Sequence, residues 1–190
     1  MGKIARILLL TESFWAFGSG LFLPIFAIFS ERVGGSIVDA GIAAAIFLLA
    51  TSTLQWPIGY LLDKYHHEKW LIAADYFLES LVFVGYIFID NKWELFVLQA
   101  LLGIANAIGD PSWESLYDRH TSLKKSGRSW AASHMFPGYL TAFGLIVGTY
   151  LISRHGFSLV FLIGSVFSFT AGVISIFLIK NGASDKHINN

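Results

Sequence analysis

The chain has 190 residues, of which 55% are hydrophobic and 14% are charged, and its formal net charge is zero. Ordinary globular domains contain about 45–50% apolar and about 25% charged residues, so this composition argues against a water-soluble fold. A neutral chain has no excess positive charge for binding nucleic acid, and the absence of cysteine excludes disulfides and thiolate chemistry.

Six long apolar segments account for most of the chain, and a membrane-spanning helix needs about 20 such residues. Their expected ranges are 5–29, 37–62, 70–89, 93–117, 131–153 and 157–179. None shows the period-two alternation of a membrane β-strand, and helices satisfy their own backbone groups within a bilayer. The sequence therefore predicts an all-α, polytopic membrane protein. We expect one six-helix transmembrane domain over residues 1–180 and a polar cytoplasmic tail over residues 181–190.

The first segment begins like a signal peptide, because Lys3 and Arg6 precede its apolar residues. It is too long for one, contains Glu12 and lacks a small-residue cleavage site, so we expect a first spanning helix. One face of this helix carries Thr11, Glu12, Trp15, Gly18, Ser19 and Phe22. An acid that faces lipid costs several kcal/mol, so this face should line protein or a water-filled path.

The connection between the second and third segments carries a compact motif. It consists of Gly59, Leu61, Asp63 and Lys64, followed by Lys69. These residues resemble the loop between helices 2 and 3 of the major facilitator superfamily, which reads Gly-x-Leu-x-Asp-(Arg/Lys)-x-Gly-(Arg/Lys)-(Arg/Lys). His66 and His67 replace the second glycine and one basic residue. The resemblance implies that Asp63 pairs across a domain interface and holds an outward-facing state.

The third and fourth segments carry most of the remaining acids. In the third, we expect Asp75 and Glu79 to be structural, because the resemblance makes this helix peripheral. In the fourth, a polar stripe spans an arc of roughly 100°. It comprises Gln99, Gly103, Asn106, Asp110, Trp113, Glu114 and Tyr117. The resemblance implies that the first and fourth helices line the transport path, and we favour Asp110 for contact with a substrate or a proton.

Gln99, Gly103 and Pro111 match the spacing of a family pattern that often begins with arginine. That arginine is linked to proton coupling in the family. A glutamine cannot hold the charge of a neighbouring acid, so the resemblance does not imply coupling by this route.

A structural interpretation of the buried acids stays open. The five acids inside the expected spans are Glu12, Asp75, Glu79, Asp110 and Glu114. At 1.5 Å per residue, all five lie within roughly 15 Å of the expected cytoplasmic helix ends. There they could form a salt-bridge lattice with Arg6, Lys69, Arg119 or Arg128. In the fifth segment, His134 is either a proton switch near neutral pH or a hydrated histidine at the interface. Gly144 and Gly148 in the same segment predict a close helix approach.

The basic residues predict the orientation. One set of connections contains ten of the lysines and arginines: Lys3, Arg6, Lys64, Lys69, Arg119, Lys124, Lys125, Arg128, Lys180 and Lys186. The other set contains three: Arg32, Lys92 and Arg154. Positively charged loops favour the cytoplasm, so both termini are expected there, in an integral protein of the plasma (inner) membrane.

No pattern of a membrane protease is found, and His66, His67 and Glu68 lack metal-ligand spacing. We therefore expect no enzyme activity, cofactor or metal. The resemblance covers one half, of three plus three helices, of a fold that usually has twelve. It implies secondary active transport of a small solute by alternating access, as a homodimer or with a sister six-helix chain. The expected path residues are Glu12, Trp15, Ser19, Gln99, Asn106, Asp110, Trp113 and Glu114. The alternative is a non-transporting accessory subunit or a truncated remnant of a transporter.

Overall fold

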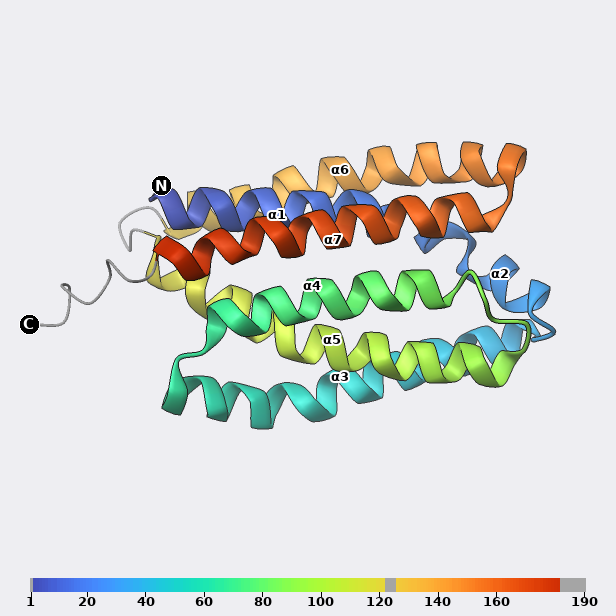
Figure 1. Ribbon diagram of the computed structural model, residues 1–190, viewed down its shortest axis with the longest axis horizontal. Coiled ribbons are helices and arrows are strands. Elements are labelled where there is room, and N and C mark those ends of the chain that lie inside the picture. Colours follow the sequence, from blue (N-terminus) through green and yellow to red (C-terminus); the bar gives the residue numbers. More distant parts are fainter. Residues whose placement is uncertain (1, 122–125, 182–190) are drawn as a thin grey trace, which may run out of the picture.

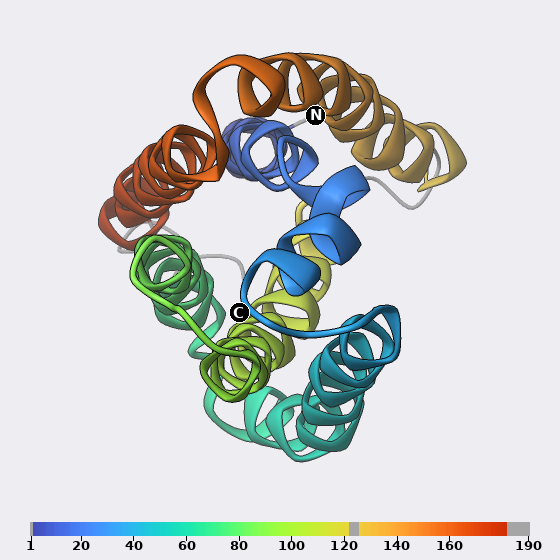
Figure 2. The same ribbon diagram turned by 90° about the vertical axis from the view of Figure 1, so that its right-hand side faces the viewer.

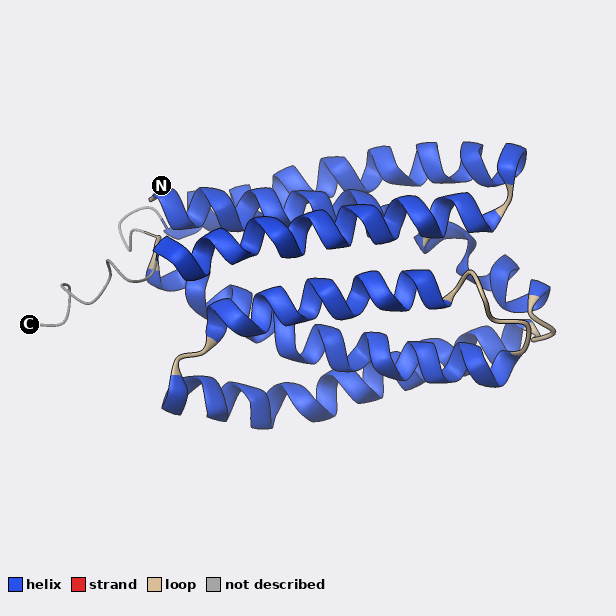
Figure 3. Ribbon diagram, viewed as in Figure 1, coloured by secondary structure: helices blue, strands red, loops and turns tan. Residues whose placement is uncertain are grey.

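The computed structural model describes residues 2–121 and 126–181, and all regular elements in these ranges are helical (Figures 1 and 3). They are α1 (Lys3–Gly20), the 3-10 turn η1 (Leu23–Ile25), α2 (Phe26–Arg32), α3 (Ile37–Tyr65), α4 (Glu68–Gly85), α5 (Lys92–Arg119), α6 (Ser126–His155) and α7 (Phe157–Asn181). This confirms the all-α prediction. Lys124, Lys125, Lys186 and the expected tail beyond Asn181 lie outside the described residues.

Four of the described helices are long and apolar enough to cross a membrane, namely α3, α5, α6 and α7. Helices α1 and α4 have only 18 residues each, and at least three residues within that length are charged, including Glu12 in α1 and Asp75 and Glu79 in α4. The structure thus supports four spans by length and composition, whereas the sequence predicted six.

The expected first segment, 5–29, is not one helix. Helix α1 ends at Gly20, and η1 separates it from α2, which begins at Phe26. Pro24 lies in η1. A proline has no backbone N–H to donate and disfavours the helical conformation in the residue before it, so a continuous helix is interrupted here.

The helices pack as two groups with matching partners (Figure 2). Helix α1 packs along α6 and α7, α5 packs along α3 and α4, and α4 joins the groups by packing along α7. Exchanging α1, α3 and α4 for α5, α6 and α7 leaves these main pairings unchanged, although the smaller contact between α6 and α7 has no counterpart of similar size between α3 and α4. Helices α1 and α5 run in opposite directions in Figure 1. This pairing has the form of an inverted three-plus-three repeat.

Close backbone approach fixes α6 against α1. An added Cβ at Gly148 would overlap the carbonyl oxygen of Leu21, and one at Gly144 would lie 2.6 Å from the carbonyl oxygen of Phe17. The predicted close approach at these two glycines is confirmed. Lys3 and Asn181, the first residue of α1 and the last of α7, lie at the same end of the bundle (Figure 1).

Candidate functional site

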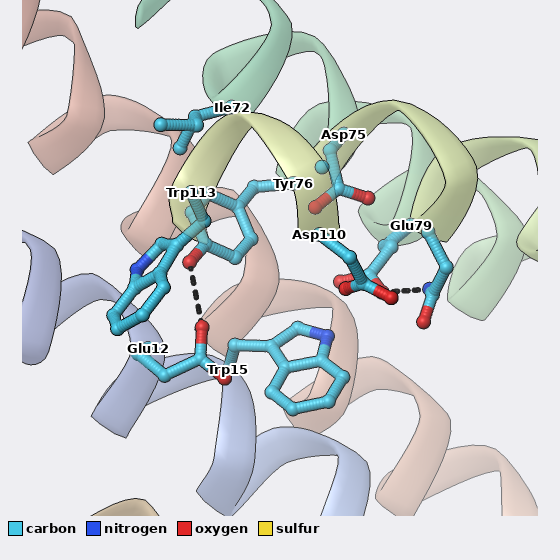
Figure 4. A pocket seen from close by; sticks show the side chains of 10 residues that line it. Glu12, Trp15, Ile72, Asp75, Tyr76, Glu79, Asp110 and Trp113 are labelled. Carbon is cyan, nitrogen blue, oxygen red and sulfur yellow. Dashed lines mark hydrogen bonds between the residues drawn. The ribbon is translucent and has the colours of Figure 1, made fainter. Parts of the chain in front are cut away.

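A small acidic pocket lies between α1, α4 and α5 (Figure 4). Its lining consists of Glu12, Trp15, Ile72, Asp75, Tyr76, Glu79, Asn106, Gly109, Asp110 and Trp113. The pocket has a volume of about 20 Å³. That volume holds roughly one water molecule.

Helical spacing brings the polar side chains of this acidic pocket together. Asp75 and Glu79 are one turn apart on α4, and Asn106 and Asp110 are one turn apart on α5, so each pair shares a helix face. Gly109 allows the two helices to meet, because a Cβ at this position would overlap the carboxylate of Asp75.

Neutral groups supply the hydrogen bonds of three pocket acids. The Tyr76 hydroxyl donates to Oε2 of Glu12 at 3.2 Å. The Asn106 side-chain amide donates to Oε1 of Glu79 at 3.0 Å. The Gln55 amide on α3 donates to Oδ2 of Asp110 at 3.2 Å.

Within the acidic pocket, two buried carboxylate oxygens have no hydrogen-bond partner in the described part of the chain, Oδ1 of Asp75 and Oε2 of Glu79. Asp75 is 7% exposed and Glu79 is 1% exposed. No lysine or arginine lines the acidic pocket. Two ion pairs with lysine or arginine, Lys92–Asp39 and Arg119–Glu68, use acids outside the pocket. The pocket lining thus offers no basic partner for the alternative of a salt-bridge lattice.

A larger apolar hollow adjoins the acidic pocket. It has a volume of about 430 Å³. Its lining consists of Trp15, Ser19, Phe22, Leu23, Phe26, Ala44, Phe47, Glu79, Phe83, Tyr86, Gln99, Leu102, Asn106 and Thr141. Trp15, Glu79 and Asn106 line both cavities, so the two form neighbouring compartments with a shared wall.

Seven of the eight predicted path residues line one or both compartments. Glu12, Asp110 and Trp113 line the acidic pocket, Ser19 and Gln99 line the apolar hollow, and Trp15 and Asn106 line both. Glu114 is exposed and lines neither compartment. The side-chain amide of Gln99 donates to the Tyr86 hydroxyl at 3.1 Å, so this buried glutamine is already paired.

Asp75 and Glu79, expected to be structural acids of a peripheral helix, take part in the candidate site. Both line the acidic pocket, together with Tyr76 from the same helix. The spacing of two acids one turn apart in an otherwise apolar helix was the available signal, because such a pair has to face protein rather than lipid. His134 is exposed and stacks on Trp130, outside both compartments.

The loop motif at the end of α3 is organised around Glu68 rather than Asp63. Arg119 contacts Oε1 of the buried Glu68 at 2.9 Å and Nδ1 of His66 at 3.2 Å. Asp63 is exposed, so its pairing across an interface stays a prediction. His66 ends α3 with a positive φ of 51°. Glycine adopts this left-handed conformation at helix ends without a Cβ penalty, which explains the glycine of the family pattern.

The remaining motif residues lie at the surface or partly buried. An added Cβ at Gly59 would meet no atom within 4 Å. The Lys64 ammonium lies 5.1 Å from the centre of the Tyr65 ring. Lys69 is half-buried in the first turn of α4. None of the three lines either compartment.

Comparison with known proteins gives one family and a set of relatives. The family model described as Major Facilitator Superfamily matches residues 8–190. Multidrug resistance protein MdtG of Escherichia fergusonii is 26% identical over 85% of this chain and 40% of its own length. The proteins of the same name from Enterobacter lignolyticus and Dickeya zeae are 25% and 28% identical, over 96% and 83% of this chain. The matches cover 44% and 38% of those two proteins, so the chain spans about two fifths of the length of these relatives.

Proposed function

Because the chain belongs to the major facilitator superfamily, we propose that it forms one six-helix half of a transporter that moves a small solute by alternating access. The observation that carries the proposal is the apolar hollow beside the acidic pocket. The hollow receives side chains from α1, α3, α4, α5 and α6, and its 430 Å³ is within the usual range of about 300–1,000 Å³ for ligand sites.

In this proposal α1 and α4 also cross the membrane. Each has 18 residues, which at about 1.5 Å per residue nearly matches the hydrocarbon core of about 30 Å. Their acids, Glu12, Asp75 and Glu79, line the acidic pocket instead of facing lipid. Among the described residues, lysine and arginine are more frequent at one set of helix ends than at the other. The first set has Lys3, Arg6, Lys64, Lys69, Arg119, Arg128 and Lys180, and the opposite set has Arg32, Lys92 and Arg154. This bias favours cytoplasmic termini and the inner membrane.

A second six-helix unit completes the path. In the most apolar stretch of α3 and of α6, 17% of the residues are buried, against 39% in α5 and 44% in α7. Both α3 and α6 contribute to the hollow, through Ala44, Phe47 and Thr141. Alternating access then consists of the two units rocking about this shared site.

Small residues on the outer faces of α3 and α6 support such a contact. A Cβ added at Gly41 or Gly59 of α3, or at Gly138 of α6, would meet no atom within 4 Å. Glycines with open space beside them in membrane helices favour close packing against another helix. Since α3 and α6 exchange places in the repeat, a parallel second copy would pack its α6 on α3 and its α3 on α6. His134 would lie in this interface as a proposed proton switch, and Asp63 would lie at its cytoplasmic end.

The name of the relatives, multidrug resistance protein, fits an apolar hollow that selects solutes by size and polarity. We therefore place small, largely apolar molecules among the transported solutes. A non-transporting accessory subunit would not need a solute-sized hollow next to buried acids.

Transport in proteoliposomes tests the proposal. Wild-type protein should move a fluorescent apolar dye faster than protein-free liposomes. Ala44→Trp should abolish this movement by filling the hollow, whereas Val166→Trp on the exposed face of α7 should not. Equal dye movement with the two folded variants would refute the hollow as the path, and dye movement no faster than in protein-free liposomes would favour the accessory-subunit alternative.

A further inference from the structure

A pair of neutral, hydrogen-bonded side chains lies in the wall of the apolar hollow. Gln99 on α5 and Tyr86 at the end of α4 both line it, and they are 5% and 2% exposed. The side-chain amide nitrogen of Gln99 donates to the Tyr86 hydroxyl at 3.1 Å. Gln99 stands at the position where the family pattern often has arginine, so this chain presents an uncharged amide there.

The pair uses only part of its hydrogen-bonding capacity. Among the described residues, Oε1 of Gln99 accepts no hydrogen bond and the Tyr86 hydroxyl donates none. A glutamine carbonyl is an acceptor, and a tyrosine hydroxyl can donate one hydrogen bond while it accepts another. The pair therefore has an acceptor and a donor left for a molecule in the hollow. Rotating the amide by 180° exchanges these roles and still leaves one group of each kind.

The other polar side chains of the hollow are bonded within the protein. The hydroxyl groups of Ser19 and Thr141 donate to one backbone carbonyl of α1, at 3.3 and 3.2 Å. Glu79 is hydrogen-bonded by the side chains of Asn106 and Trp15. Among the described residues, no lysine or arginine lines the hollow, so an anionic group would find no charged partner there.

An entirely apolar solute would not suit this wall. Such a solute would displace water from Gln99 and Tyr86 and leave both groups without a partner, which is costly in a buried site. A site that hydrogen-bonds a polar group of its ligand discriminates strongly against an analogue that lacks this group. The apolar part of the lining, which includes Phe22, Phe83 and Leu102, offers contact surface for the rest of the solute.

Resting on the proposed function, we propose that the solute is an uncharged molecule with an apolar body and one group that both donates and accepts hydrogen bonds, such as a carboxamide. Gln99 and Tyr86 recognise this group together, and the body of the solute lies against the phenylalanines of the hollow. The pair thereby determines which of the apolar molecules that enter the hollow are bound.

Three naphthalenes of equal size test the inference. Naphthalene-1-carboxamide has a donor and an acceptor, 1-acetylnaphthalene has only an acceptor, and 1-isopropylnaphthalene has neither. Each is dialysed against the purified protein in lipid nanodiscs, and empty nanodiscs give the amount dissolved in the lipid. In wild-type protein, the ratio of saturable binding to lipid partitioning should be highest for the carboxamide and lowest for the isopropyl compound.

Substitutions locate the recognition within the hollow. Gln99→Leu should weaken carboxamide binding by about tenfold or more and leave isopropyl binding unchanged or tighter. Tyr86→Phe, which keeps the aromatic ring, should weaken carboxamide binding by a smaller factor because the amide remains. Tyr150→Phe, at an exposed tyrosine of α6 outside both compartments, should change neither. If Gln99→Leu does not fold, the order of the three ligands in wild-type protein decides.

Four results would overturn the inference: no saturable carboxamide binding by folded wild-type protein, equal ratios for the three ligands, unchanged carboxamide binding by folded Gln99→Leu, or an equal loss of carboxamide and isopropyl binding in that variant. Equal ratios together with loss of all binding in Ala44→Trp would reject recognition by the pair while leaving the hollow as a solute path. Failure of dye transport in proteoliposomes would instead reject the proposed function itself.

Discussion

Replacing Gly148 by alanine should loosen the packing of α6 on α1. The added Cβ would overlap the carbonyl oxygen of Leu21, and all three nearest atoms belong to the Leu21 backbone. Backbone atoms cannot move aside by a change of rotamer, so the two helices have to separate. Overpacking of this kind costs about 1–3 kcal/mol.

Gly138 provides a matched control on the same helix. A Cβ there would meet no atom within 4 Å, so alanine should be neutral or stabilising by up to about 1 kcal/mol through its higher helix propensity. Thermal unfolding followed by circular dichroism, in detergent where the protein is monomeric, measures both variants. A cost of 1 kcal/mol corresponds to about 2–4 °C in a domain of this size. If Gly148→Ala and Gly138→Ala have the same melting temperature as wild type, the close contact between α1 and α6 does not exist.

Three further predictions concern the loop motif, the topology and the interface. His66→Gly should raise the melting temperature, because a left-handed residue with a Cβ costs about 1–2 kcal/mol. The exposed contact of His66 with Arg119 offsets only part of this cost, and a lower melting temperature would contradict this reasoning. In this cysteine-free chain, Glu31→Cys should react with an impermeant thiol reagent from outside and Asp118→Cys only from inside, and reversed labelling would reject the orientation. Asp63→Cys in one copy and His134→Cys in another should crosslink in native membranes. Crosslinking only to a different protein would show that a sister unit, and not a second copy of this chain, forms the other half.

Hydropathy was sufficient to predict that most of the helices exist. Runs such as Ile37–Tyr65 and Phe157–Asn181 are apolar enough that their existence follows from composition, and only their ends shifted. The interruption after Gly20 was missed because the apolar pattern continues across Pro24, and the backbone effect of proline was not weighed against it.

The candidate site was only partly accessible from the sequence. Helical spacing identified the faces that carry Glu12 and Asp110, because acids in a spanning helix have to turn away from lipid. The same argument applied equally to Asp75 and Glu79, but we expected them to be structural because the resemblance makes their helix peripheral, and so the pocket they line was missed. The apolar hollow could not be predicted, since its shape depends on how α3 and α6 are placed relative to α1 and α5.

The His66 position shows how a departure from a family pattern acquires a structural meaning. The sequence indicated only that histidine replaces glycine. The structure gives the reason for glycine, a left-handed residue at the end of α3, and shows that the imidazole contacts Arg119. Glu68 was not singled out, because its pairing with Arg119 joins residues that are 51 positions apart.

Accessibility of Ala44 from the two sides of the membrane is the sharpest test of alternating access at the apolar hollow. Ala44 lines the apolar hollow, and the absence of natural cysteines makes Ala44→Cys the single reactive site. Alternating access predicts that an impermeant thiol reagent labels this cysteine from outside in outward-facing molecules and from inside in inward-facing molecules. Solute should slow both reactions. Val166→Cys on α7 should resist labelling from either side. Labelling of Ala44→Cys from one side only, with no protection by solute, would contradict the account.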